Sequence, residues 1–358
     1  MRAAAPGCGY NGANTVDPFE RRPIGRTDLR VTALGCGSAT LGDMRGVIPE
    51  AQSDATLEAA CEAGIGYFDT APWYGRGKSE HRVGRVLRTR PRESYVLSTK
   101  IGRVLFRPGD PVAFAAEVGG GPLPFDLRFD YTGDGVLRSY EDSLQRLGLT
   151  GVDALLIHDL DLGYHQTEAG VEARLRELED GGGYAALEGL KRQGQIRAIG
   201  AGINVTGMIP RFLARFPLDF FLVAMPYTLL SQEALDVELP LCAAHGASVV
   251  VGAPFASGIL AAGPEAGTAA TYAYRPADAG TVDKTRRIEA VCRRHGVPLG
   301  AAALQFPLGH PSVVAVIPGP NTVAQARANV EWMRTPIPAA LWADLKADGL
   351  LHPAAPTP

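Results

Sequence analysis

The chain contains only five cysteines in 358 residues, and no two of them form a Cys-x-x-Cys pair. This odd, scattered set excludes a disulfide scaffold and a zinc ribbon, and it predicts reduced thiols, a cytoplasmic location and no metal site. Long hydrophobic runs are also missing. Because no stretch of about 18 apolar residues occurs, we expect no membrane span and no membrane partner.

Positive charge is scarce as well. The formal net charge is −3 and no segment gathers lysine and arginine, so the sequence does not predict a nucleic-acid partner. Apolar residues make up 46% of the chain, enough for a large core. The first 20 residues are rich in Gly, Ala, Pro and Asn and predict a flexible leader. Residues 351–358 predict a flexible tail, which leaves 21–350 as a single domain.

Within that domain, short apolar runs alternate with longer amphipathic ones. The predicted strands cover residues 31–37, 65–71, 94–100, 152–158, 196–202, 219–225, 247–254 and 312–318. Predicted helices between them include 53–64, 136–148, 184–194 and 322–333. Eight such units favour an α/β fold of the (β/α)8 TIM barrel type over a doubly wound sheet. The longest irregular segment, 103–134, is expected to be a surface loop.

Polar residues mark the ends of three predicted strands. Asp69, Lys100 and His158 each stand where a strand ends, and Tyr74 follows five residues after Asp69. Taken singly, such residues are more often caps, solvated lysines or packing aromatics. In a barrel, however, the carboxyl ends of the strands meet at one face, where active sites are built. The sequence therefore predicts one site containing all four side chains.

These four side chains suit carbonyl and alcohol redox chemistry. A free phenol has a pKa near 10, which makes it a poor proton shuttle at neutral pH. A neighbouring ammonium lowers that pKa, and a carboxylate holds the ammonium in place. A neutral imidazole orients a substrate oxygen by hydrogen bonding. We therefore expect proton transfer through the phenol while a cofactor carries the hydride.

The sequence also resembles the aldo-keto reductase family over nearly its whole length, from about Arg22 to Leu345. The segments "FDTAPWYGRGKSEHRVG", "LSTKIG", "DSLQRLGLTGVDALLIHD", "IRAIGAG" and "VIPG" follow the order and spacing of the family. The resemblance implies a nicotinamide cofactor and a catalytic tetrad. In it, Tyr74 is the acid/base, Lys100 tunes its pKa, Asp69 pairs with Lys100, and His158 orients the substrate.

The same resemblance implies a set of cofactor-binding residues along the barrel mouth. They are Gly37, Ser38, Asp69, Gly202, Asn204, Ala253, Phe255, Ser257, Gly258, Pro318, Gly319, Asn321, Gln325 and Asn329. A helix starting at Asn321 or Thr322 would offer its N-terminus to an anion. Gly319 and Gln325 stand where NADPH-preferring relatives carry Lys and Arg, so we expect NAD, with NADP as the alternative.

A narrower resemblance concerns the reaction. "STKIGR", "FDYTGDGVLRS", "GAGIN" and "YTLL" are similar to the branch of the family that oxidises aldoses and pyridoxal. That branch implies a small-molecule substrate, a cyclic hemiacetal oxidised to its lactone. Trp73, Phe106, Tyr227 and His158 are the expected substrate-binding residues. The alternatives are an NADPH-linked aldehyde reductase and a non-catalytic redox-sensing subunit. The sequence leaves the oligomeric state open.

The segment "GRGKSE" admits a second interpretation as a phosphate-binding loop. A Walker motif needs Gly five residues before Gly77, and Pro72 stands there. We therefore expect only a turn leading into a helix over 79–89. Ser79 would be the N-cap of that helix, and Arg82 and Arg85 would lie on its solvated face.

Overall fold

The computed structural model describes residues 15–44, 46–267 and 270–358, so residues 1–14 of the expected leader lie outside the described residues. Eight parallel strands form one sheet in the order β3, β4, β5, β8, β9, β10, β11 and β14. Their bounds are Cys36–Gly37, Tyr67–Asp69, Val96–Ile101, Ala154–His158, Ala198–Ile203, Phe220–Ala224, Ser248–Gly252 and Val313–Ile317. A parallel bridge from Leu34 to Val316 joins the first strand segment to the last. The prediction of a (β/α)8 barrel is confirmed.

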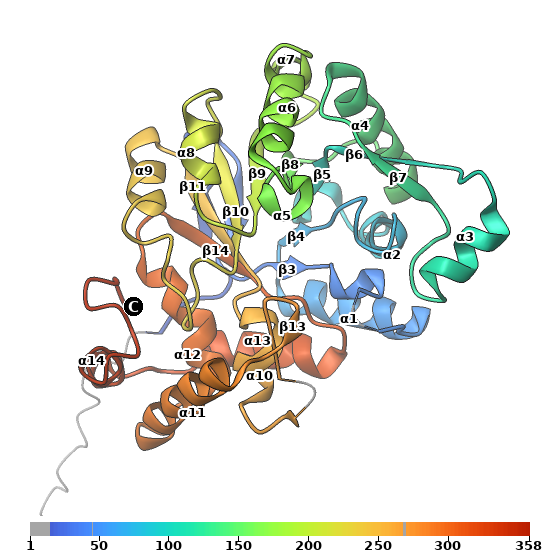
Figure 1. Cartoon of the computed structure of the whole chain (residues 1–358). Helices are drawn as coiled ribbons and strands as arrows, with labels where there is room; N and C mark the ends of the chain where they lie inside the picture. Colours follow the sequence, from blue (N-terminus) through green and yellow to red (C-terminus); the bar gives the residue numbers. More distant parts are fainter. Residues whose placement is uncertain (1–14, 45, 268–269) are drawn as a thin grey trace, which may run out of the picture.

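Helices surround the barrel on its outer side (Figure 1). They are α1 Glu50–Ala63, α2 Lys78–Leu87, α4 Gly133–Leu147, α5 Leu162–His165, α6 Glu168–Glu179, α7 Gly183–Arg192, α8 Met208–Leu213, α9 Glu238–His245, α10 Ile259–Ala262, α11 Ala279–Arg294, α12 Leu299–Gln305, α13 Val323–Arg334 and α14 Ala339–Ala347. No helix in the described part of the chain is long and apolar enough to cross a bilayer.

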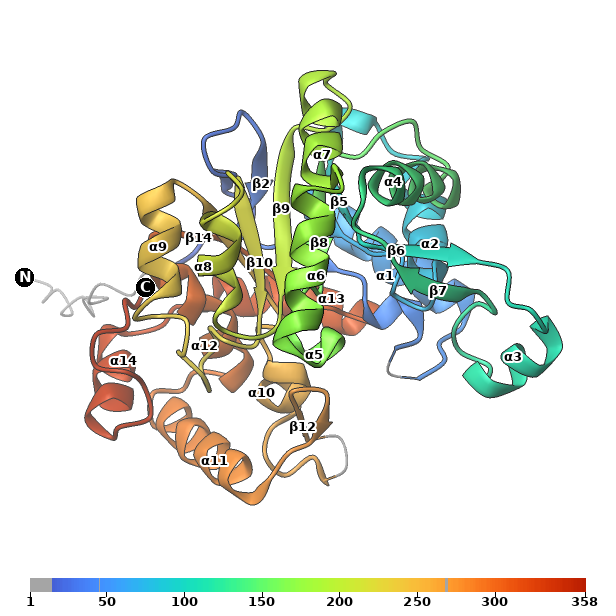
Figure 2. The same cartoon turned by 45° about the horizontal axis from the view of Figure 1, so that its top comes forward.

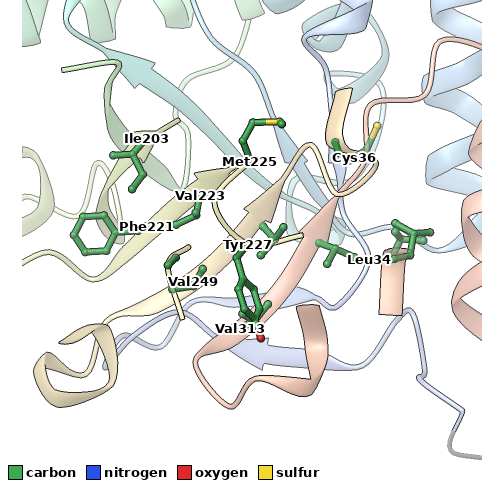
Figure 3. Close-up of a cluster of buried hydrophobic side chains, with 14 of the residues drawn as sticks. Leu34, Cys36, Ile203, Phe221, Val223, Met225, Tyr227, Val249 and Val313 are labelled. Carbon is green, nitrogen blue, oxygen red and sulfur yellow. The ribbon is translucent and has the colours of Figure 1, made fainter. Parts of the chain in front are cut away.

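The core has two layers because successive strand residues point to opposite faces. On β10, Phe220 and Leu222 face the barrel interior, where they join Ile24 and Leu29 of the region around the hairpin of β1 (Arg21–Pro23) and β2 (Arg30–Thr32). Phe221 and Val223 belong to the other cluster, which includes residues of the surrounding helices (Figure 3). This alternation explains why both strand faces are apolar in the sequence.

The segment 103–134 is not the irregular loop that we expected. Strands β6 (Arg103–Phe106) and β7 (Asp126–Phe129) form an antiparallel hairpin, and α3 (Pro111–Val118) lies between them. Figures 1 and 2 show α3 as the part of this excursion that projects farthest from the barrel. The glycine and proline residues of the segment mark the turns between these short elements. A second hairpin joins β12 (Thr271–Tyr272) and β13 (Arg275–Pro276).

Both chain ends are more ordered than expected within the described residues. The backbone NH groups of Leu34 and Ala33 donate to the carbonyl oxygens of Pro18 and Glu20, so residues 18–20 belong to the folded domain. The predicted flexible tail also packs on the barrel, since Leu351 and Ala355 are buried. Only two of the eight tail residues are buried, so the sequence carries little sign of this packing.

Candidate active site

Asp69 and Lys100 form a buried ion pair at the carboxyl ends of adjacent strands. Asp69 is the last residue of β4 and Lys100 the penultimate residue of β5. The Lys100 Nζ lies 2.5 Å from Asp69 Oδ2 and also donates to the carbonyl oxygen of Thr70 at 2.8 Å. Ser98 donates to the other carboxylate oxygen at 2.7 Å. Both partners of the pair are almost fully buried, so each charge depends on the other.

Tyr74 and His158 complete the constellation. Tyr74 lies on the loop after β4, and Lys100 Nζ is 4.7 Å from the centroid of its ring. His158 ends β8 and meets the Tyr74 ring edge-on, with 5.7 Å between ring centroids. The structure thus brings all four predicted catalytic residues to one site. Their positions follow from strand register, because β4, β5 and β8 are neighbours in the sheet.

The electrostatics of the site differ in one respect from our expectation. Burial, together with the negative charges of Asp69 and Asp159, raises the pKa of Tyr74 well above its usual value. The expected lowering by Lys100 does not dominate here, so the phenol is protonated at neutral pH. Burial and the positive charges of Arg103 and Lys100 hold the pKa of His158 well below its usual value. This imidazole is therefore neutral.

A cluster of hydroxyl groups fixes the loops around Asp69. Ser79 donates to the carbonyl and hydroxyl oxygens of Ser38, and Ser38 donates to the carbonyl oxygen of Asp69 at 2.7 Å. The prediction of Ser79 as an N-cap is wrong, because α2 begins at Lys78 with Gly77 as its N-cap. The Ser38 hydroxyl, expected near the cofactor, forms hydrogen bonds to Asp69 and Ser79 within the protein.

The prediction that Arg82 lies on a solvated face is also wrong. Its guanidinium is buried, pairs with Asp43 and Glu50, and donates to the carbonyl oxygens of Leu41 and Ile48. Arg82 therefore ties Leu41, Asp43, Ile48 and Glu50 to α2. A helical pattern alone does not reveal such a partner, since the acidic residues lie more than 30 positions away.

The residues expected around the nicotinamide line the same end of the barrel. Gly202, on β9, presents bare backbone; a Cβ there would lie 3.6 Å from His158 and 3.7 Å from Lys100. This missing side chain leaves a cradle beside both catalytic groups. Asn204 follows it and donates from Nδ2 to Asp159 at 2.8 Å. The backbone NH of Gly37 donates to Pro318, which ties β3 to the loop after β14.

The loop after β11 has an unusual backbone. Ala253, Ala256 and Ser257 all have positive φ, of 46°, 49° and 72°, where residues other than glycine are uncommon. Such strain persists where function requires a particular loop shape. Phe255 is anchored in this loop by edge-on contact with Trp332 of α13, with 5.6 Å between ring centroids. This contact ties the loop to the C-terminal part of α13.

The expected helix start near Asn321 is present. Thr322 is the N-cap of α13 and accepts from the backbone NH of Gln325, while Gln325 Oε1 accepts from the backbone NH of Asn321. Gly319 and Gln325 are exposed, and Asn329 is buried on the same helix. Neither exposed position offers a cation. Taken together, the cradle at Gly202, the strained loop and this helix end fit a dinucleotide.

Only part of the predicted substrate set lies at the site. Trp73 precedes Tyr74, and its ring is 5.1 Å from the guanidinium carbon of Arg103. Phe106 is on the β6–β7 hairpin and is 36% exposed. Tyr227 was predicted wrongly: it is fully buried within the hydrophobic cluster shown in Figure 3. Its ring packs against Phe306 and His310. The turn after β10 directs this ring into the core, away from the barrel mouth.

Sequence reasoning missed two charged residues beside the tetrad. Arg103 NH2 pairs with Asp159 Oδ2 at 2.9 Å, and both side chains are nearly fully buried. The same carboxylate oxygen lies 3.4 Å from His158 Nε2. The sequence does place each of them near a predicted catalytic residue, because Arg103 follows Lys100 by three residues and Asp159 follows His158 directly. It does not show that the two residues pair with each other.

Comparison with known proteins identifies relatives of the whole domain. A family model described as "Aldo/keto reductase family" matches residues 33–347. Pyridoxal 4-dehydrogenase of Microbacterium luteolum is 39% identical, covering 93% of this chain and 98% of its own. D-threo-aldose 1-dehydrogenase of a Pseudomonas species is 38% identical, covering 92% and 96%. Among solved structures, aldo-keto reductase AKR11C1 of Bacillus halodurans in its holo form has a TM-score of 0.72 at 26% identity, covering 94% and 98%.

Proposed function

The chain belongs to the aldo/keto reductase family, whose members use a nicotinamide cofactor, and from that premise we propose an oxidation. The substrate is a cyclic hemiacetal, either an aldose such as L-fucose, L-galactose or D-arabinose, or pyridoxal. The product is the lactone and the cofactor is NAD. The two relatives near 40% identity are named for reactions on these two substrate classes, which supports the proposal.

One observation carries this proposal. The Asp69–Lys100 ion pair, Tyr74 and His158 meet at the carboxyl end of three adjacent strands, with Gly202 leaving space beside Lys100 and His158. A phenol and a neutral imidazole facing each other suit a substrate oxygen placed between them. A lone structural ion pair would not explain a glycine cradle at the same point.

The chemistry of each protein group follows from its surroundings. NAD, once bound, would supply the hydride acceptor for the hemiacetal carbon. Tyr74 accepts the hydroxyl proton, which requires its phenolate form. Lys100 stabilises that phenolate by its charge, and Asp69 keeps the ammonium in position. His158 is neutral because burial, together with the positive charges of Arg103 and Lys100, lowers its pKa, and it orients the substrate oxygen by donating a hydrogen bond. Asn204, the 253–258 loop and the N-terminus of α13 would hold the cofactor.

Oxidation is expected to accelerate with pH. The reactive phenolate is the deprotonated form of Tyr74, whose pKa is raised well above 10. Its population therefore increases about tenfold per pH unit between pH 7 and 9. We expect kcat/KM for oxidation to rise steeply over this range, whereas the rate of lactone reduction does not rise. Initial rates at constant ionic strength measure both. An oxidation rate that is flat from pH 7 to 9 would exclude Tyr74 as the base.

Cofactor choice is expected to depend on position 325. Replacing Gln325 with arginine should raise kcat/KM with NADP by about tenfold, because a guanidinium there would pair with the 2′-phosphate. Gln325→Leu is the matched control, since it also loses the bond to the Asn321 backbone but adds no charge. An equal gain in both variants would refute this assignment of the 2′-phosphate position.

The proposed function is tested by comparing NAD and NADP directly. Absorbance at 340 nm with each oxidised cofactor and the four named substrates should show at least tenfold higher kcat/KM with NAD. A strong preference for NADPH in the reduction of aldehydes would favour the reductase alternative. Cofactor binding without turnover of any substrate would favour the redox-sensing subunit.

A further inference from the structure

Arg103 carries hydrogen-bond donors that nothing in the described part of the chain satisfies. Its guanidinium is 2% exposed, and only NH2 has a polar partner. Nε and NH1 are buried without a hydrogen-bond acceptor. Native structures seldom leave buried donors unpaired, and a charged donor is the most costly to leave so. Arg103 begins β6, three residues after Lys100, and pairs with Asp159 next to His158, which places these donors at the active site.

Three aromatic rings surround this guanidinium. The ring centroids of Trp73, Phe129 and Tyr164 lie 5.1, 4.8 and 4.7 Å from its central carbon. Such contacts offset part of the cost of burying the cation. They do not provide lone pairs for Nε and NH1. All three rings are partly exposed, Tyr164 the most, at 38%.

The Asp159 carboxylate adds acceptors next to those donors. It accepts from Arg103 through Oδ2 and from Asn204 through Oδ1, and Oδ2 lies 3.4 Å from His158 Nε2. Each carboxylate oxygen can accept more than one hydrogen bond. The residue also has a positive φ of 50°, an uncommon conformation for a non-glycine residue. Unpaired donors and spare acceptors thus lie side by side, in contact with a catalytic residue.

We propose that Arg103 and Asp159 form a recognition site for a ring hydroxyl group of the substrate, separate from the hydroxyl that is oxidised. A hydroxyl accepts from Arg103 and donates to Asp159 at once, which neither a carbonyl nor an alkyl group does. The three rings offer apolar faces to the carbon skeleton of the same substrate. This inference rests on the proposed function, and it covers sugar hydroxyls and the phenolic hydroxyl of pyridoxal alike.

Binding requires a rearrangement that can be observed. Because Nε and NH1 are buried, a substrate hydroxyl reaches them only after neighbouring side chains move. We expect the rings of Trp73 and Tyr164, 5.1 and 4.7 Å from the guanidinium carbon, to be among them. Trp73 is one of three tryptophans in the chain, and the other two pack elsewhere: Trp332 against Phe255 and Trp342 against Phe306. Substrate binding should therefore change the tryptophan fluorescence, and a Trp73→Phe variant should abolish that change.

The test combines substrate analogues with a conservative variant. Monodeoxy analogues of each accepted sugar, and 3-deoxypyridoxal, are titrated by fluorescence without NAD and assayed for kcat/KM with NAD. For the wild-type enzyme, removal of one particular ring hydroxyl should lower kcat/KM by about 10³-fold, because the loss of that hydroxyl leaves buried polar groups of the enzyme unpaired. Arg103→Lys keeps the positive charge opposite Asp159 but removes the guanidinium donors Nε and NH1. In this variant, removal of the same ring hydroxyl should lower kcat/KM by less than about tenfold.

Arg76→Met is the matched control. Arg76 also stacks on Trp73, at 5.9 Å, but its NH1 donates to the carbonyl oxygen of Phe125. This variant should keep the wild-type discrimination. Equal discrimination by wild type and Arg103→Lys at every ring position would overturn the inference, as would an equal loss in Arg76→Met. If binding weakens when a ring hydroxyl is removed, but no substrate is turned over with NAD, only the proposed function is refuted. Failure of the inference and failure of the proposed function therefore give different results.

Discussion

Replacing Tyr74 with phenylalanine is expected to lower kcat for oxidation by 10²- to 10⁴-fold, the usual contribution of a positioned acid or base. The ring keeps its edge-on contact with His158 and its place below Lys100, so only the hydroxyl is lost. Cofactor binding should therefore be unchanged. Steady-state rates with NAD, together with the dissociation constant of NADH from fluorescence titration, measure the two effects separately.

Tyr95→Phe provides the matched control for that experiment. Its hydroxyl is buried and has no hydrogen-bond partner among the described residues. The residue belongs to the core cluster that contains Phe221 and Val223. We expect wild-type kcat from this variant. A Tyr74→Phe enzyme with wild-type turnover would contradict the assignment of the phenol as the acid/base, and the proton path would then need another group.

Replacing Lys100 with methionine is expected to abolish activity and to destabilise the fold by about 3–5 kcal/mol. The substitution leaves the Asp69 carboxylate buried, with Ser98 as its remaining side-chain partner. Adding Asp69→Asn should recover most of the stability, because no unpaired charge remains, but none of the activity. Urea denaturation gives the free energy of unfolding, and the 340 nm assay gives the turnover of each variant.

A more exposed ion pair serves as the comparison. Lys191 pairs with Asp219 on the outside of the barrel, with 35% of the lysine side chain exposed. Lys191→Met should cost no more than about 1 kcal/mol and leave turnover unchanged. If Lys100→Met destabilised the fold no more than Lys191→Met, the buried pair would not have the role that we assign to it.

Much of the fold could be predicted from the sequence because most barrel strands contain runs of apolar residues that are buried on both faces. The runs containing Tyr67–Asp69, Val96–Ile101 and Ala154–His158 were visible for this reason, and so were the polar residues that end them. The hairpin of β6 and β7 was not visible, because its strands are short and pair only with each other. The tail buries only two isolated apolar residues, Leu351 and Ala355, which carry no periodic signal.

The missed features of the site share one physical cause. Arg82 and Asp43, like Arg103 and Asp159, are partners far apart in the chain that meet only when the barrel closes. A sequence pattern describes one element at a time, so a buried arginine on a helix looks the same as a solvated one. Tyr227 shows the converse: an aromatic residue at a strand end was assigned to the mouth, but the local turn places it in the core.

The central claim is that this barrel oxidises a cyclic hemiacetal through Tyr74 with NAD. Its most direct test is to incubate the wild-type enzyme with NAD and each of L-fucose, L-galactose, D-arabinose and pyridoxal. NADH is followed at 340 nm and the product is identified by NMR. The account predicts one lactone formed per NADH with at least one of these substrates. Absence of lactone with all four, alongside rapid NADPH-dependent reduction of simple aldehydes, would contradict it.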